Sequence, residues 1–370
     1  MNGAEINGRH AGAILNVNLD SIQANYRLLL ERLGGVPSAA VVKANAYGLG
    51  VEHVAPALAE AGCSIFFVTH LEEGVRLRGI LTDAEIHVLN GLLASSEEVY
   101  PTHRLTPVLN SLGEIEGWRR LCGETPLACD IHVDTGMLRL GLPPDELEAI
   151  KDAPSIVAGL NVANVISHLS SADQPNSAQN AEQLARYRRV REILPLGRAC
   201  FTNSSGIFLS PDYHFDLARP GVALYGVAPV PGEPNPLNPV VELGACILQR
   251  REASRGEAVG YGATYRFEKP GLIATLAVGY ADGLLRSLSN NGAAYIGGIR
   301  VPIVGRVSMD LITIDVSAVA EPASRPGQWV ELIGPNNTVD DVARAAGTIG
   351  YEILTNLGTR YHRAYTGGGD

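Results

Sequence analysis

The sequence predicts an α/β domain built on a parallel sheet, followed by a smaller and mostly antiparallel β domain. In its first part, stretches with apolar residues at helical spacing alternate with short β-prone runs, and repeated βα units are typical of parallel sheets. From residue 240 onward, short alternating runs are separated by Gly, Pro and Asn turns, as in antiparallel β domains. The first pattern by itself allows either a closed barrel or an open sheet.

The parallel part begins with a helix over residues 20–33, in which Ile22, Tyr26 and Leu29 recur at helical spacing. A β-prone run ending at Lys43 follows this helix. The same order of helix and strand is predicted again further along the chain, at residues 53–61 and 64–68, 71–79 and 85–89, and 184–194 and 198–202. Further strands are predicted at residues 128–134 and 162–171.

A proline-rich stretch over residues 226–239 separates the two patterns and indicates an ordered linker. After it, the alternating runs predict strands at residues 240–248, 272–278, 301–304, 311–316 and 329–332. We therefore expect a first domain over residues 13–238 and a second over residues 239–370.

Composition narrows the function classes. The chain has 370 residues, 46% hydrophobic content and a formal net charge of −10, which disfavours nucleic-acid and membrane partners because both require basic surface. Its five cysteines form no C-x-x-C pair, so neither a disulfide framework nor a thiolate zinc site is indicated. Residues 1–12 are polar and contain no export signal, so we expect a cytoplasmic enzyme.

Lys43 is the first candidate for chemistry, because it ends an apolar run and is followed at once by small residues that favour turns. The carboxyl ends of parallel strands hold the active site in α/β barrels, so this amine would point into a site. An amine there can form a Schiff base with a carbonyl compound. The alternative is a solvated lysine at a strand end, which is common.

Residues 128–134 alternate, so that Asp130, His132 and Asp134 share one face of a predicted strand. Two carboxylates and an imidazole suit a divalent ion. However, the three side chains spread along the strand instead of converging, and no second cluster completes a ligand shell. We therefore expect no metal site.

The segment at residues 42–50, VKANAYGLG, resembles the pyridoxal-phosphate lysine signature of the alanine racemase family. The resemblance runs from about residue 14 to the C-terminus and includes further motifs at residues 134–141, 203–206, 218–222, 260–265, 279–283, 305–310 and 351–355. It implies that the first domain is an eight-stranded TIM-like α/β barrel. It also implies that the strand-like residues 14–19 could join the sheet of the second domain.

The resemblance implies the cofactor pyridoxal 5′-phosphate and the interconversion of L-alanine and D-alanine by two bases. Lys43 would carry the cofactor covalently and act as one base. Tyr261 would be the other base, supplied to the site of the partner subunit in a homodimer. The expected contacts of the cofactor are Lys43, Tyr47, His168, Asn203, Ser204, Arg219, Gly221 and Tyr351. The expected contacts of the substrate are Arg139, Met309 and Tyr280.

Two of these roles have alternatives in the sequence itself. By resemblance Arg219 faces the pyridine nitrogen, and since a guanidinium keeps its proton, it would donate a hydrogen bond without protonating the ring. Without the resemblance, Arg219 could equally pair with Asp216. Arg139 would contact the phenolic oxygen of the cofactor and the substrate carboxylate, or could pair with Asp134.

The sequence departs from the family at two places. Many relatives have a lysine, carbamylated in some, where this chain has His132, so Arg139 must be held by the imidazole, an anion or Asp130. Leu284 and Leu285 stand where relatives commonly have an aromatic residue and a proline, which leaves the shape of the entrance and the substrate breadth, alanine alone or serine as well, open.

We therefore expect an alanine racemase that supplies D-alanine for cell-wall peptidoglycan. A decarboxylase of the same fold type would also use a barrel lysine, but it would need less carboxylate clamping than Arg139 and Met309 provide and would leave Tyr261 without a role. A pyridoxal-phosphate carrier without activity would need no second domain.

Overall fold

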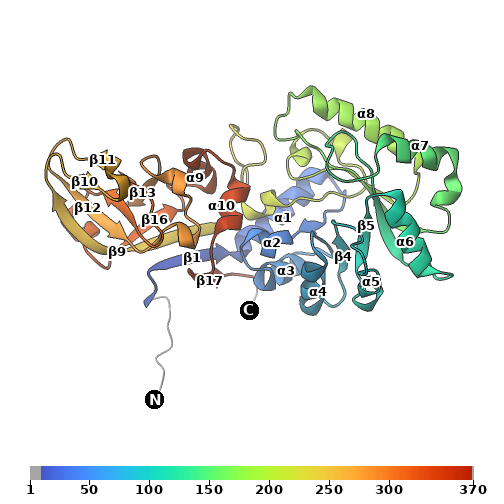
Figure 1. Cartoon of the computed structure of the whole chain (residues 1–370), viewed down its shortest axis with the longest axis horizontal. Helices are drawn as coiled ribbons and strands as arrows, with labels where there is room; N and C mark the ends of the chain where they lie inside the picture. Colours follow the sequence, from blue (N-terminus) through green and yellow to red (C-terminus); the bar gives the residue numbers. More distant parts are fainter. Residues whose placement is uncertain (1–9, 369–370) are drawn as a thin grey trace, which may run out of the picture.

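The computed structural model describes residues 10–368 of the chain, so most of the polar stretch over residues 1–12 lies outside the described residues. Figure 1 shows two parts: a barrel with surrounding helices, and a β domain with two short helices at its junction with the barrel. None of the helices in the described part of the chain is long and apolar enough to cross a membrane.

The barrel contains a seven-stranded parallel sheet in sequential order. Its strands are β2 (Ala40–Val41), β3 (Ile65–Val68), β4 (Glu85–Val88), β5 (Thr106–Leu109), β6 (Ala128–His132), β7 (Asn161–Ile166) and β8 (Arg198–Cys200). Its helices are α1 (Leu19–Leu33), α3 (Val51–Glu60), α4 (Leu71–Ile80), α5 (Val99–Thr102), α6 (Leu112–Cys122), α7 (Pro144–Asp152) and α8 (Ala178–Ile193). This confirms the expected α/β barrel.

The place of the eighth strand is taken by residues 217–220, which lie between β8 and β2. The N–H of Arg219 donates to the carbonyl of Thr202 over 3.0 Å on one side. On the other side the N–H of Val41 donates to the carbonyl of Pro220 over 3.0 Å, and Ser38 forms a parallel bridge with Ala218. The segment closes the ring but is too irregular to count as a strand, because Pro220 has no N–H to give to a ladder.

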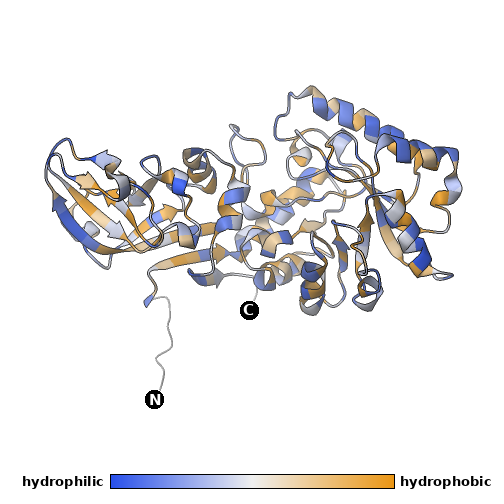
Figure 2. Cartoon of the chain, in the orientation of Figure 1, coloured by the Kyte–Doolittle hydropathy of each residue, from blue (hydrophilic) through white to orange (hydrophobic). Residues whose placement is uncertain are grey.

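The helices pack on the barrel through one apolar face each. In α1 the residues that predicted the helix are the buried ones, with Ile22, Tyr26 and Leu29 at 2% exposure or less. Helix α8 begins at Ala178, six residues before the predicted start, because its first turns are polar and lack the apolar period. In Figure 2 this helix is mostly hydrophilic, while the strands inside the barrel are mostly hydrophobic.

The second domain is organised on the long strand β9 (Val241–Ala253), which pairs antiparallel with β1 (Ala13–Asn18), β12 (Gly271–Leu276) and β16 (Trp329–Ile333). The other strands are β10 (Ala258–Val259), β11 (Tyr265–Arg266), β13 (Ala293–Ile296), β14 (Ile299–Pro302), β15 (Ile312–Asp315) and β17 (His362–Thr366). Strand β1 also pairs with β17, in parallel, so the first strand of the chain belongs to this eight-stranded sheet. A mostly antiparallel β domain was expected and is confirmed.

Helices α9 (Val339–Ala346) and α10 (Gly350–Asn356) join the two domains. One continuous apolar core contains Val17 of β1, Leu354 of α10 and the interior of the barrel. The second domain therefore stands fixed against the rim of the barrel, which lets α10 form part of the site.

Candidate active site

A cavity of about 920 Å³ lies at the carboxyl ends of the barrel strands, with α10 as part of its wall. It collects all the side chains that the sequence assigned to the cofactor, together with Arg139 and His132. Tyr261, Tyr280 and Met309 do not line it. They lie on the second domain with exposed fractions of 73%, 43% and 53%. The site residues thus fall into a group that lines this cavity and a group on the surface of the second domain.

The backbone after Lys43 is unusual. Strand β2 ends at Val41, and residues 44–47, none of them glycine, form a left-handed turn, with φ between 52° and 56°. Such a conformation costs about 1–2 kcal/mol for each residue, so it persists only where neighbouring contacts impose it. Sequence analysis predicted a turn here, but not its hand.

The contacts that hold this turn come from both domains. The carboxylate of Glu73, in the first turn of α4, accepts the N–H groups of Ala44 over 2.5 Å and of Thr69 over 2.9 Å. From β17, the guanidinium of Arg363 donates to the carbonyl of Gly48 over 2.7 Å, and the hydroxyl of Tyr365 donates to the carbonyl of Leu49 over 2.9 Å. Strand β17 of the second domain thereby fixes the turn that carries the lysine.

The amine of Lys43 is tuned toward its neutral form. Burial lowers the pKa of the amine, the charges of Arg139 and Arg219 lower it further, and the carboxylate of Glu73 acts in the opposite direction. Because only an unprotonated amine can attack a carbonyl or take a proton, this environment favours both roles.

Arg219 lies only 4% exposed beneath the cavity. Its Nε donates to the sulfur of Cys200 over 3.0 Å and its Nη2 to the carbonyl of Ser167 over 2.6 Å. The carboxylate of Asp216 instead accepts the N–H of Ala199 over 2.7 Å, so the alternative pairing of Arg219 with Asp216 is wrong. Both hydrogen bonds of the Arg219 guanidinium within residues 10–368 go to neutral acceptors, which leaves its charge to attract an acceptor or an anion in the cavity.

A cradle of hydrogen-bond donors lies on the other side of the cavity. The hydroxyl oxygen of Ser204 accepts the N–H groups of Gly221 over 2.9 Å and Ala223 over 3.2 Å, so its own proton is free to donate to a ligand. A Cβ at Gly221 would lie 2.2 Å from the hydroxyl oxygen of Tyr47, so only glycine fits there. The ring of Tyr351 lies 6.1 Å from the ring of Tyr47. Hydroxyl donors and a bare backbone suit a phosphate group.

Two further residues shape the cavity between these ends. Asn203 bonds through its amide to the N–H of Gly206 over 2.9 Å and to the carbonyl of Leu169 over 3.2 Å, and so fixes the turn that presents Ser204. His168 follows β7. Burial, together with the nearby charges of Arg219 and Arg139, keeps the pKa of its imidazole well below the usual value, so the ring is neutral.

His132 has a partner that the sequence did not reveal. Its Nδ1 lies 2.8 Å from the Oδ1 of Asn110, the residue after β5, whose Nδ2 donates to the carbonyl of Val108 over 2.7 Å. The amide oxygen therefore faces the imidazole, so we assign the proton to Nδ1 and leave Nε2 as an acceptor. Burial and the charge of Arg219 lower the pKa of His132 to about 3. Sequence analysis predicted no strand at residues 106–109, so it gave no signal for Asn110.

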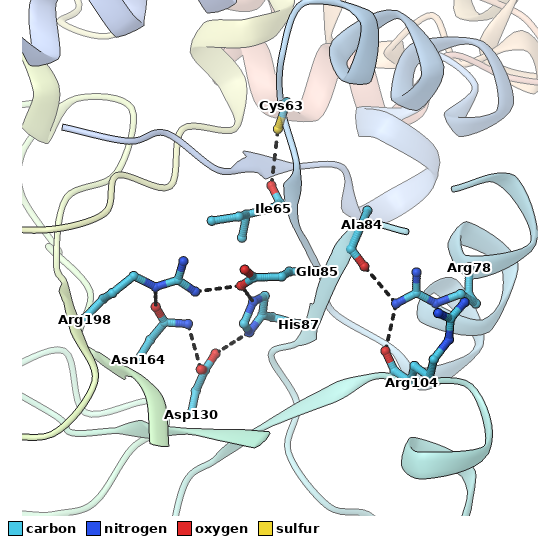
Figure 3. Close-up of polar contacts among 10 residues, drawn as sticks. All are labelled: Cys63, Ile65, Arg78, Ala84, Glu85, His87, Arg104, Asp130, Asn164 and Arg198. Atoms are coloured by element: carbon cyan, nitrogen blue, oxygen red, sulfur yellow. Dashed lines mark hydrogen bonds and ion pairs between the residues drawn. The ribbon is translucent and has the colours of Figure 1, made fainter. Parts of the chain in front are cut away.

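Asp130 does not serve Arg139. Its side chain is fully buried and binds the Nδ1 of His87 and the Nδ2 of Asn164, each over 2.7 Å, inside the barrel (Figure 3). Glu85 and Arg198 complete this network, with Arg198 donating to Glu85 over 2.7 Å. Burial alone would lower the pKa of His87, but Asp130 and Glu85 raise it to about 9.

Asp134 makes contacts that differ from those of Asp130 and His132. Its carboxylate accepts the N–H groups of Gly136 and Met137, each over 2.8 Å, and of Leu138 over 3.0 Å. It holds the loop that carries Arg139 instead of forming an ion pair with that arginine, so the second alternative is also wrong. Asp130 and His132 lie on β6 and Asp134 follows it by two residues, yet each has its own partner.

Residues 17–229 match the model of the alanine racemase N-terminal domain, and residues 240–365 match that of the C-terminal domain. The chain belongs to the alanine racemase family. It is 49% identical to the catabolic alanine racemase of Mesorhizobium japonicum over 97% of this chain and 94% of that one, and 46% identical to an alanine racemase of Brucella ovis over 97% and 96%. The structure superimposes on alanine racemase from Bartonella henselae, with covalently bound pyridoxal phosphate, with a TM-score of 0.93 and 42% identity over 96% of this chain and 100% of that one.

The protein is therefore a pyridoxal-phosphate-dependent racemase. The cavity fits this cofactor: the donor cradle suits its phosphate and the close contact at Gly221 suits a close backbone approach. Arg219, which has no carboxylate partner among residues 10–368, suits the ring nitrogen. The amine of Lys43 lines the same cavity.

Proposed function

We propose that this enzyme interconverts L-alanine and D-alanine with two bases, Lys43 and Tyr261, at sites shared between the subunits of a homodimer. One observation carries the proposal: the cavity of this chain contains Lys43, while Tyr261 lies 73% exposed on the other domain. Tyr261 stands between Gly260 and Gly262, both at positive φ, in an exposed turn. An exposed base can act only at a site that another chain brings to it.

The surface around both groups supports a subunit contact. Leu138 and Leu140, on the loop that carries Arg139, are exposed by 89% and 42%. Beside Met309, Leu311 is 40% exposed. Apolar side chains exposed near a cavity mouth and near an exposed base fit a two-fold contact in which each chain covers the other.

We assign the cofactor contacts as follows. When bound, pyridoxal phosphate supplies an electron sink for negative charge at the α-carbon of the amino acid. Lys43 holds the cofactor covalently, and Arg219 donates a hydrogen bond to its ring nitrogen without giving up a proton. His168 supplies a flat neutral ring for stacking. The phosphate is held by Tyr47, Ser204, Gly221 and Tyr351, with Asn203 shaping the turn.

The remaining residues act on the amino acid. Arg139 and the N–H of Met309 hold the substrate carboxylate, and Tyr280 lines the entrance. Inversion requires that a proton leave one face of the α-carbon and another arrive at the opposite face, so two bases must flank it. Lys43 removes the proton from D-alanine and Tyr261 removes it from L-alanine. The lowered pKa of Lys43 prepares its amine for this work.

The two rivals considered from the sequence are less well supported. Neither a decarboxylase nor a carrier without activity accounts for a match to both alanine racemase domains. Chiral analysis of alanine after incubation with the purified enzyme tests the proposal, and parallel incubation with serine measures breadth. Formation of a racemic mixture from either enantiomer of alanine is expected. Loss of carboxylate or absence of turnover would refute the proposal.

We further propose that the enzyme acts in the cytoplasm and supplies D-alanine for peptidoglycan. Relatives from Mesorhizobium and Agrobacterium are named catabolic alanine racemases, so breakdown of D-alanine is the second candidate role. A deletion strain separates the two. A requirement for added D-alanine supports the supply role, and failure to grow on D-alanine as carbon source supports the catabolic role.

We place the domain boundary at residue 239, in the proline-rich segment, with residues 13–238 and 239–370 on either side. The pairing of β1 with β9 and β17 supports assigning this first strand to the second domain. Limited proteolysis within residues 229–239 tests the boundary.

A further inference from the structure

Arg360, in the turn that follows α10, bridges two loops of the second domain. Its Nε lies 3.0 Å from the carboxylate of Asp282, and its Nη1 lies 2.8 Å from the carboxylate of Asp310. The side chain of Asp282 is 6% exposed and that of Asp310 is 56% exposed. A single planar guanidinium thus pairs with a buried and an exposed carboxylate at the same time, a geometry that a lysine cannot reproduce.

The buried carboxylate organises the loop that carries Tyr280. The second oxygen of Asp282 accepts the N–H of Gly279 over 2.8 Å, and its backbone carbonyl accepts the N–H of Gly358 over 2.9 Å. Without Arg360, the charge of Asp282 would be left buried with only its backbone donor, which is costly in a protein interior. The loop at residues 279–283 would then move or admit water.

The same loop is bonded to the one that carries Met309. The N–H of Tyr280 donates to the carbonyl of Ser308, and the N–H of Ala281 donates to that of Met309, each over 2.9 Å. A Cβ at Gly279 would lie 2.3 Å from the carbonyl oxygen of Met309, so the two backbones are in close contact. Through Asp282 and Asp310, Arg360 therefore sets the position of both loops together.

These loops belong to the exposed group of site residues. Neither Tyr280 nor Met309 lines the cavity formed by this chain within residues 10–368, yet both lie on loops that Arg360 holds. Arg360 itself follows α10, whose residues Tyr351 and Glu352 do line that cavity. The arginine could thus act on its own subunit through α10 or on the partner through the loops, and its ion pairs point to the loops.

We propose that Arg360 is a positioning residue for the site of the partner subunit, where it holds the Tyr280 and Met309 loops in the arrangement that receives the amino acid. The inference rests on the proposed sharing of sites. Arg360 does not line the cavity, and in this proposal it acts through Asp282 and Asp310.

The test begins with R360Q, which removes the charge and keeps the length. We expect kcat/KM for alanine to fall about 10²-fold, since small displacements of substrate-positioning groups have effects of this size. Because the N–H of Met309 is assigned to the substrate carboxylate, KM should rise more than kcat falls. A merely destabilised protein would instead lose active enzyme and hence kcat. The control is R325Q, which breaks an exposed pair with Glu321 in the same domain and should change kcat/KM less than about twofold.

Mixed dimers decide which site Arg360 serves. R360Q is mixed with K43A, and separately with Y261F, under conditions that allow subunit exchange. In the first mixture, each mixed dimer has one site with an intact Lys43 and intact loops from the K43A chain, so activity should recover to about a quarter of wild type. In the second mixture every site of a mixed dimer lacks either Tyr261 or the Arg360 contacts, so activity should not rise above that of R360Q alone.

The reverse pattern, recovery with Y261F and none with K43A, would show that Arg360 acts on its own subunit and overturn the proposal, as would recovery in neither mixture or full activity of R360Q. A parallel mixture of K43A with Y261F tests the shared site itself, and its failure to recover would overturn both proposals by a separate measurement.

Independently of activity, the amides of Tyr280 and Ala281 should exchange hydrogen faster in R360Q than in R325Q, and equal rates would contradict the proposal. Should R360Q not fold, D310N removes only the exposed ion pair and should give the same mixing pattern with a smaller loss.

Discussion

The two groups of site residues differ in how they are held. In the barrel, Ser204 and Arg219 are 3% and 4% exposed and are fixed by hydrogen bonds from their own chain. On the second domain, Tyr261 and Met309 are 73% and 53% exposed, and the residue after Met309, Asp310, forms an ion pair with Arg360. A cofactor that must be retained suits a buried and prearranged half. The base that we propose for a shared site, Tyr261, has to be exposed on its own chain, and the proposed site is complete only when a second chain binds.

The largest effect on activity is expected from a substitution among the residues that line the cavity. Lys43→Ala should lower activity by more than about 10⁴-fold, because it removes a base as well as the covalent anchor of the cofactor. Borohydride reduction of the wild-type enzyme followed by peptide mapping checks the anchor. A reduced label on Lys151 or Lys269 in place of Lys43 would contradict the assignment.

The next largest effect is expected from a substitution among the exposed residues of the second domain. Tyr261→Phe should lower racemisation about 10³-fold through the loss of one base, while exchange of the α-hydrogen of D-alanine with D₂O through Lys43 continues. Mass spectrometry and chiral chromatography of the same sample measure the two processes. Equal loss of exchange and inversion would argue against separate bases.

Mixing of two variant subunits tests whether Lys43 and Tyr261 act together at a site shared by two chains. Lys43→Ala and Tyr261→Phe, mixed in equal amounts with exchange of subunits, should recover about a quarter of wild-type activity, because each mixed dimer regains one complete site. If the two residues instead met within one chain, every site would still lack a base. Verified exchange of subunits without recovery would thus refute the shared site.

A smaller effect is expected from the contact between Asn110 and His132. Asn110→Ala removes the acceptor that fixes the proton on Nδ1 of His132, and kcat/KM should fall about tenfold, the typical cost of a lost buried hydrogen bond. The wild-type enzyme should need no added bicarbonate, since an imidazole cannot form the lysine carbamate found in some relatives. A bicarbonate requirement that disappears on changing His132 would count against this view.

The smallest effect on activity is expected from His87, which lies buried inside the barrel. The folded-state pKa of His87, about 9, lies above its value of about 6.5 in an unfolded chain, so its stabilising contribution is complete below pH 6.5 and is lost as the pH rises through 9. The free energy of unfolding of the wild type should fall between pH 6.5 and 9 by up to about 3 kcal/mol more than that of His87→Gln. Denaturant titrations at several pH values measure this. Parallel curves for the two proteins would show that His87 is not charged in the fold.

Local sequence patterns were sufficient to predict many of the helices and strands of this enzyme, its two domains and its cofactor. The 3.6-residue period located α1, and the apolar runs located most barrel strands, because both depend on neighbours a few residues apart. The sequence of residues 42–50 around Lys43 indicated the cofactor and the family. The change from alternating helix and strand patterns to short β-prone runs, at the proline-rich segment, indicated two domains.

Only the tertiary structure decided the rest, because it depends on partners far apart in the chain. The eighth position of the barrel is taken by residues 217–220 through bonds to residues near 40 and 200. His132 is oriented by Asn110, and Asp130 by His87 and Asn164, from strands that local periodicity cannot bring together. The left-handed turn after Lys43 is imposed by Glu73 and by β17, from opposite ends of the sequence, since its residues would not adopt it alone.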